Sequence, residues 1–167
     1  MFLSNNPYRI LGILSNTGIK DIQKNLSKLK AFAKIGREVE LDYNFSFLNL
    51  AKLDRSDVLL SKSENQLNLD KDKITNSLFW FADLSPIDSV ALGHLVKGDI
   101  SKVIEIWDKA TTSKEVSLKN YSAFNNLSTL LLLNNLDDSK TDTFKKDNVS
   151  IKQIKKAIKL KNVFISS

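Results

Sequence analysis

The sequence predicts an all-α fold. Its 167 residues include only two prolines and five glycines, so few residues interrupt helices. Apolar residues recur at intervals of three and four along much of the chain, the spacing of one buried helix face. Hydrophobic residues make up 42% of the chain, an ordinary value for a globular protein. A chain of this length forms one compact domain or two small ones.

The first predicted helix spans residues 7–11. Asn6 stands at its cap position, Pro7 lies at an early helical position, and Gly12 ends it. A second helix is predicted over residues 18–35. Its buried face consists of apolar residues spaced by three and four: Ile19, Ile22, Leu26, Leu29 and Ala33. Gly36 is a suitable residue to end it.

Residues 37–49 show a different pattern. Apolar and polar residues alternate strictly from Val39 to Phe47, which taken alone is typical of a strand. No second strand is predicted to pair with it, and a lone strand leaves its backbone groups unsatisfied. We therefore expect an extended segment whose aromatic side chains lie on the helical core. A short hairpin is the alternative.

Six further helices are predicted from capping residues and apolar spacing. Asp54 or Ser56 caps the first of them, Ser85 and Asp99 cap the third and fourth, and Ser150 caps the last. In the second of them, apolar residues share one face: Ile74, Leu78 and Phe81. The predicted ranges are 57–67, 71–82, 86–97, 100–110, 117–136 and 150–164, with a polar loop over 137–147.

The N-terminal segment resembles a J-domain. From Asn6 the chain reads N-P-Y-R-I-L-G-I-L-S-N-T-G-I-K-D-I-Q-K-N-L-S-K-L-K-A-F-A-K-I-G, which aligns without a gap onto the start of that family. In this register the His-Pro-Asp triad of J-domains falls on Lys34, Ile35 and Gly36. The resemblance implies a basic helix that docks on an acidic chaperone surface, carrying Lys20, Lys24 and Lys28. Without the triad, we do not expect stimulation of a DnaK-type ATPase.

A second stretch, residues 87–110, resembles a tetratricopeptide repeat. It reads I-D-S-V-A-L-G-H-L-V-K-G-D-I-S-K-V-I-E-I-W-D-K-A. The resemblance implies helix-packing positions at Val90, Ala91, His94, Val103, Trp107 and Ala110. A degenerate second copy has its first-helix positions at Phe124, Leu127, Ser128 and Leu131. A helical hairpin must stack on a neighbour to bury its apolar face.

These resemblances predict two regions: a J-domain-like helical hairpin at residues 1–83, packed on a short tetratricopeptide-like helical array at residues 84–167. Repeat arrays need about three units or capping helices to be stable. The chain also ends on the apolar residues Val163, Phe164 and Ile165. We therefore expect the region to continue in a longer native protein.

The net charge of +6 is unevenly distributed, and residues 145–167 hold seven lysines against Asp147 alone. In the last predicted helix, basic residues recur at three and four: Lys152, Lys155, Lys156 and Lys159, with Lys161 beyond. An amphipathic basic helix can contact phosphate or an anionic surface. No arginine or aromatic residue lies among these lysines, and specific recognition of nucleic-acid bases relies on those two residue types. We therefore do not expect specific nucleic-acid binding. The simplest interpretation is a helix with a solvated face.

The sequence gives little support for a catalytic or metal-binding site. The chain has no cysteine and a single histidine, and it contains no phosphate-binding, nucleophile or zinc-protease motif. His94 is predicted to have a structural role, since a general base also needs a positioned partner. Phe79, Trp80 and Phe81 with Trp107 are predicted to be core joining the two halves, rather than a platform for stacking bases. We expect no enzyme, no cofactor and no metal.

The sequence therefore predicts a cytoplasmic, non-catalytic scaffold or adaptor for protein–protein interaction. The N-terminus lacks the features of a secretory signal, and the longest apolar run, Leu130 to Leu133, is far shorter than the roughly 20 residues of a membrane span. The candidate partner-binding lysines are Lys20, Lys24 and Lys28 with Lys152, Lys155, Lys156 and Lys159. One alternative is a nonspecific nucleic-acid or anionic-surface binder, and a second is a co-chaperone of a DnaK-type chaperone.

Overall fold

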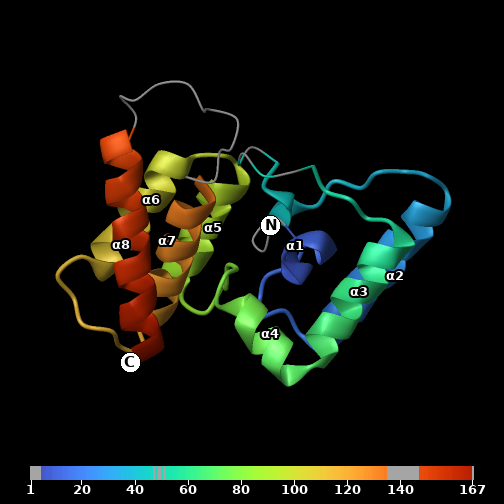
Figure 1. Ribbon diagram of the computed structural model, residues 1–167, viewed down its shortest axis with the longest axis horizontal. Coiled ribbons are helices and arrows are strands. Elements are labelled where there is room, and N and C mark those ends of the chain that lie inside the picture. Colours follow the sequence, from blue (N-terminus) through green and yellow to red (C-terminus); the bar gives the residue numbers. More distant parts are fainter. Residues whose placement is uncertain (1–4, 47, 49, 51, 135–146, 167) are drawn as a thin grey trace. The chain divides into compact units, whose positions relative to one another are not determined.

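The structure is a computed structural model, and it describes residues 5–46, 48, 50, 52–134 and 147–166 (Figure 1). Within these ranges every regular element is helical and none is a strand, which confirms the all-α prediction. The α-helices are α1 (Pro7–Leu11), α2 (Ile19–Lys34), α3 (Asp57–Asn68), α4 (Asp70–Ser77), α5 (Pro86–Val96), α6 (Ile100–Thr111), α7 (Tyr121–Asn134) and α8 (Asp147–Ser166). A single 3-10 turn, η1, spans Asp42–Asn44.

The chain divides into two compact units. The first comprises Met1–Phe45 and Ala51–Ala82, and the second comprises Ser46–Leu50 and Asp83–Ser167. Each unit has its own apolar core, with Trp80 fully buried in the first and Trp107 fully buried in the second.

The first unit is built around α1. This helix is buried along its whole length and contacts α2, α3 and α4. Asn6 caps it as predicted: its side-chain oxygen accepts from the backbone N–H of Tyr8 at 3.0 Å, and its amide nitrogen donates to the carbonyl of Asn76 at 2.9 Å. One buried side chain thus satisfies the start of α1 and attaches it to α4, while α2 and α3 lie side by side next to it (Figure 1).

Aromatic residues form another part of this core. Trp80 and Phe81 are fully buried and lie edge to face, with ring centroids 5.5 Å apart. Phe45 packs against both of them, and the indole N–H of Trp80 donates to the carbonyl of Ile13 at 2.8 Å. The indole and both phenyl rings are therefore closed to solvent, so Trp80 and Phe81 cannot form a stacking platform for bases.

The segment after α2 is neither a strand nor a hairpin in its described residues. It forms the turn η1, which ends at Phe45 in the left-handed region with φ 48°. Phe45 reaches the core, as the alternating pattern predicted for its aromatic residues, whereas Val39 and Leu41 are only half-buried. Arg55 holds the segment in place, donating to the carbonyls of Ile10 and Val39 at 2.7 Å each.

Three predicted buried positions are wrong. Ile19 is 68% exposed, and it is the first residue of α2. Ile74 is 62% exposed, since α4 ends at Ser77 and its eight residues present a short buried side that holds Asn76. Val90, assigned to a repeat-packing position, is 56% exposed on α5. Periodicity marks a helix face, but only the neighbouring helices determine how far the buried face extends.

The second unit is a bundle in which α7 is the central helix. It packs against α5, α6 and α8, and all of its residues from Ser122 to Leu131 are buried. The helix starts at α5 and α6 follow the prediction: the side chains of Ser85 and Asp99 accept from the N–H groups of Asp88 and Lys102. The predicted loop at 137–147 lies outside the described residues except for Asp147, which begins α8.

The predicted repeat positions of this unit are mostly buried. The buried ones are Ala91, Val103, Trp107, Ala110, Phe124, Leu127, Ser128 and Leu131. His94 is only partly buried, and its imidazole Nδ1 lies 3.4 Å from the carboxylate of Asp99. The histidine thus sits beside the residue that caps α6, next to the turn between α5 and α6.

Gly12 provides a test of the first unit. Its φ of 63° lies in the left-handed region, and an added Cβ would come within 2.9 Å of the Cβ of Leu41. We expect Gly12→Ala to lower the free energy of unfolding by about 1–3 kcal/mol, because backbone strain and steric overlap with Leu41 both destabilise the folded state. Urea denaturation followed by circular dichroism measures the loss. Gly18→Ala is the matched control, since φ there is −67° and no atom lies within 4 Å. Equal stabilities of the two variants would contradict this account.

Candidate binding surfaces

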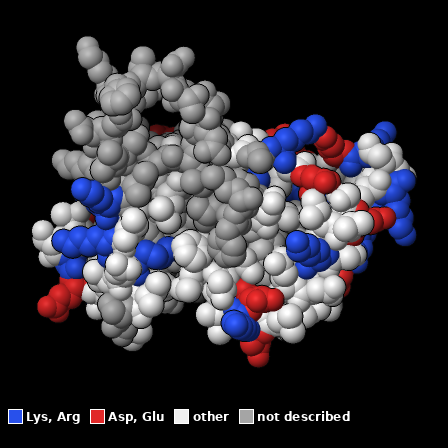
Figure 2. All heavy atoms as spheres, viewed as in Figure 1, with Lys and Arg blue, Asp and Glu red and all other residues white. Residues whose placement is uncertain are grey.

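The lysines of α2 form an exposed row, the α2 basic face, which consists of Lys20, Lys24 and Lys28. All three side chains are exposed, and no salt bridge joins them to an acidic residue within the described ranges. Lys30, two residues after Lys28, instead pairs with Glu64 of α3 at 2.9 Å. Over the α2–α3 part of the face drawn in Figure 2, basic and acidic side chains are interspersed. The α2 basic face is thus a local row of charge on one helix.

The three positions that the J-domain resemblance aligns with the His-Pro-Asp triad lie directly after this row. Lys34 is the last residue of α2, Ile35 is its C-cap and is 65% exposed, and Gly36 follows with φ 65°. These residues present an ammonium group, an apolar side chain and bare backbone to solvent. None of these three residues carries an imidazole or a carboxylate.

The described lysines of α8 lie in different surroundings. Lys155 and Lys159 are exposed, but Lys156 forms an ion pair with Asp108 of α6. Lys161 is buried, with 5% of its surface exposed. The side chain of Lys152 lies outside the described residues. The basic residues of α8 are therefore divided between solvent and the helices on which α8 packs.

Lys161 is bound by polar groups of α7. Its ammonium nitrogen donates to the side-chain oxygen of Asn125 at 2.6 Å and to the hydroxyl of Thr129 at 3.0 Å. Its third acceptor is the carbonyl of Asn125 at 3.4 Å. None of these acceptors carries a charge, and burial lowers the pKa of Lys161 to about 7.

A buried carboxylate lies on another side of α7. Asp88 of α5 is fully buried, and its two oxygens accept hydrogen bonds from α6, α7 and the start of α5. The indole of Trp107 donates at 3.1 Å and the amide of Asn126 at 2.9 Å to one oxygen. The hydroxyls of Ser85 and Ser122 donate to the other oxygen at 2.8 and 2.5 Å. This carboxylate connects three helices of the second unit.

Sequence reasoning missed both buried charges. It assigned Asp88 no role in packing or binding, and it treated Lys161 as part of a solvated face. The signal lies in α7, where polar residues occur in pairs four apart within an otherwise apolar helix: Ser122 with Asn126, and Asn125 with Thr129. A buried helix with such pairs needs polar partners on its neighbours.

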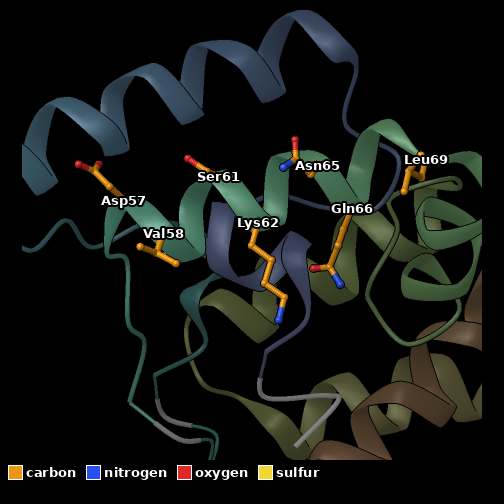
Figure 3. A pocket seen from close by; sticks show the side chains of 7 residues that line it. All are labelled: Asp57, Val58, Ser61, Lys62, Asn65, Gln66 and Leu69. Atoms are coloured by element: carbon orange, nitrogen blue, oxygen red, sulfur yellow. The ribbon is translucent and has the colours of Figure 1, made fainter.

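In the described part of the chain, α3 borders at least two hollows. The first, the α3 hollow, has a volume of about 610 Å³ and is lined by residues from Asp57 to Leu69 (Figure 3). The second, the amide pocket, has a volume of about 230 Å³. It is lined by the amides of Asn5, Gln66 and Asn76, the hydroxyl of Ser63, the ammonium of Lys62, and the apolar Ile10 and Leu59. Lys62 and Gln66 line both hollows, so the two are adjacent.

In the described part of the chain, no group of three or more His, Asp or Glu residues is placed to hold a metal ion. None of the helices described there is both long and apolar enough to cross a membrane. Comparisons with protein-family models, with curated proteins and with solved structures find no match to this chain. The resemblances to J-domains and tetratricopeptide repeats therefore stay predictions from the sequence.

Proposed function

We propose that this chain is a non-catalytic protein-interaction module whose α2 basic face docks on an acidic surface of a protein partner. The observation that carries the proposal is the exposure of Lys20, Lys24 and Lys28 in one row without an acidic partner among the described residues. A row of like charges on one helix attracts a surface of opposite charge and orients the encounter.

Other lysines of the protein support this interpretation by contrast. Lys102 and Lys109 both pair with Glu105, at 2.9 and 2.6 Å, and Lys156 pairs with Asp108. Acidic residues thus neutralise these three lysines, whereas the α2 basic face keeps its charge. A surface with unneutralised charge of one sign is available for a partner of the opposite sign.

The helical hairpins of the second unit support a scaffold role. α7 contacts both α5 and α6, and α8 packs on α7, so two hairpins stack through α7. Stacked hairpins are the arrangement that interaction scaffolds of the repeat type use to present a surface. A tetratricopeptide-like role for this unit is part of the same proposal.

The proposal is tested by photo-cross-linking in the native cytosol. A photoreactive amino acid at Gln23, which is exposed on α2, is expected to capture a defined partner. Capture should fall at least tenfold when Lys24 and Lys28 are both changed to Glu, because the charge reversal turns attraction into repulsion. The matched control is Lys114→Glu with Lys119→Glu, two exposed lysines of the second unit, which changes the net charge equally. Equal capture in both double variants would contradict the proposal.

The salt dependence of DNA binding distinguishes the nucleic-acid alternative from the proposed protein partner. Binding to mixed-sequence DNA, if it reflects charge alone, should disappear by physiological ionic strength and should weaken equally in the two double variants. Tight DNA binding at that salt, lost only in the α2 variant, would replace the proposed protein partner with a nucleic acid.

The co-chaperone alternative is tested by ATP hydrolysis. We expect no acceleration of single-turnover hydrolysis by a DnaK-type chaperone, because Lys34, Ile35 and Gly36 provide no group that could act in the triad's place. Docking energy alone does not stabilise a transition state. A several-fold acceleration that disappears in Lys24→Glu/Lys28→Glu would restore the co-chaperone role.

A further inference from the structure

The amide pocket has a composition unlike the rest of the surface. Two of the polar residues that line it are buried: Ser63 is 1% exposed and Asn76 is 4% exposed. Gln66 and Asn5 add two more carboxamide or amide groups, while Ile10 and Leu59 provide an apolar wall. Carboxamides carry both donors and acceptors, so they complement a group that also carries both.

The two buried polar residues keep unused hydrogen-bonding capacity. The Asn76 amide nitrogen donates to the carbonyl of Asp72 at 2.7 Å, and the Ser63 hydroxyl donates to the carbonyl of Leu59 at 2.8 Å. Within the described residues, the side-chain oxygen of Asn76 accepts no hydrogen bond. A ligand in the pocket can therefore donate to the Asn76 oxygen and accept from the second N–H of the same amide. This pairing matches a peptide group.

Among the described residues that line the amide pocket, Lys62 is the one that carries a charge. Its side chain and that of Gln66 point to the same side of α3, while Ser61 and Asn65 point to the other (Figure 3). No described acidic residue forms an ion pair with Lys62. The pocket thus combines peptide-like hydrogen bonding with a single positive charge at its wall, and that combination selects a ligand carrying a carboxylate.

We propose that the amide pocket binds one acidic residue, together with an adjoining peptide group, of a protein partner. The inference rests on the proposed function only in taking the ligand from a protein, since it uses none of the lysines of α2. The volume of about 230 Å³ lies below the roughly 300–1,000 Å³ of pockets for drug-sized ligands, and so suits a single residue. The adjacent α3 hollow can hold the partner residues that neighbour this acidic residue in sequence.

The test is an NMR titration of the ¹⁵N-labelled chain with N-acetyl-glutamate N-methylamide, a glutamate with a peptide group on each side. We expect saturable shifts of the side-chain amide signals of Asn5, Gln66 and Asn76. The matching glutamine compound should bind about tenfold more weakly, because it lacks the charge that pairs with Lys62. Acetate should also bind more weakly, because it lacks the peptide groups.

Two variants and one control sharpen the result. Lys62→Gln should weaken the glutamate compound to the level of the glutamine compound, and Gln66→Glu should abolish binding by placing a like charge at the wall. Lys71→Gln removes an exposed lysine of α4 that does not line the pocket, and it should leave the titration unchanged.

The absence of saturable shifts would overturn the inference, and so would equal binding of acetate and the glutamate compound, which would indicate a site for small anions only. Equal weakening by Lys62→Gln and Lys71→Gln would overturn it as well. Lys24→Glu/Lys28→Glu should leave this titration unchanged. If the photo-cross-linking test fails and the titration gives the expected shifts, the proposed function is contradicted and the pocket inference is supported. If cross-linking succeeds and the titration shows no saturable shifts, the pocket inference is contradicted and the proposed function is supported.

Discussion

Asp88→Ala is expected to lower the free energy of unfolding of the second unit by about 3–5 kcal/mol. The carboxylate is fully buried and accepts from Ser85, the N-cap of α5, and from side chains of α6 and α7. The methyl group that replaces it accepts nothing. The indole of Trp107 and the amide of Asn126 would then lie buried without this acceptor. Each donor left without its acceptor costs about 1–3 kcal/mol. Urea denaturation, with hydrogen exchange of the α5, α6 and α7 amides, measures the loss.

Asp99→Ala is the matched control for this prediction. Asp99 also accepts from the N–H at the start of a helix, but it is exposed, and it lies 3.4 Å from the imidazole Nδ1 of His94. Its replacement should cost about 1 kcal/mol, the usual value for a cap. Asp88→Asn should fall between the two, because an amide has one acceptor oxygen where the carboxylate has two. Similar losses for Asp88→Ala and Asp99→Ala would show that the buried network adds nothing beyond a cap.

The stability of the second unit is expected to rise with pH between about 7 and 10.5. Burial lowers the pKa of Lys161 to about 7 in the folded chain, whereas the unfolded chain has the ordinary value of 10.5. In that window the unfolded state binds more protons than the folded state, so raising the pH favours folding by at most about 1.4 kcal/mol per pH unit. Below pH 7, Lys161 is protonated in both the folded and the unfolded chain, so the stability gained from its deprotonation in the folded chain is lost. Urea denaturation at several pH values measures the rise.

Lys161→Met should flatten this pH dependence, because methionine occupies a similar volume and does not titrate. Lys159→Met is the matched control, since Lys159 is exposed on the same helix and its replacement should leave the rise in place. The prediction fails if Lys161→Met and Lys159→Met show the same pH dependence. It also fails if the unmodified chain has equal stability at pH 7 and pH 10.

Helix starts and ends could be predicted from the sequence because the interactions that produce them are local. Asn6 caps α1 through the N–H of a residue two positions away, and Gly12 ends it in a conformation that glycine adopts most easily. Ser85 and Asp99 likewise accept from N–H groups three residues ahead. These contacts hold within one turn of chain, whatever the helix later packs against.

The segment after α2 could not be predicted in this way. Its alternating pattern is typical of a strand, but its path depends on Arg55, which donates to carbonyls 16 and 45 residues distant in sequence. The aromatic ring of Phe45 reaches Trp80 and Phe81, also far along the chain. A pattern of period two indicates which side chains seek the core, and distant partners determine the backbone that carries them there.

The same division holds for the candidate binding surfaces. By itself the sequence determined the all-α class, the helix caps and the row of Lys20, Lys24 and Lys28, because spacing along one helix decides which side chains share a face. Only the tertiary structure decided that Lys156 pairs with Asp108, that Lys161 and Asp88 are buried, and that Lys62, Ser63 and Asn76 line one pocket. Burial and pairing depend on which helices meet. Contacts between helices bring together residues more than ten positions apart in the sequence, and a local sequence pattern contains no information about such contacts.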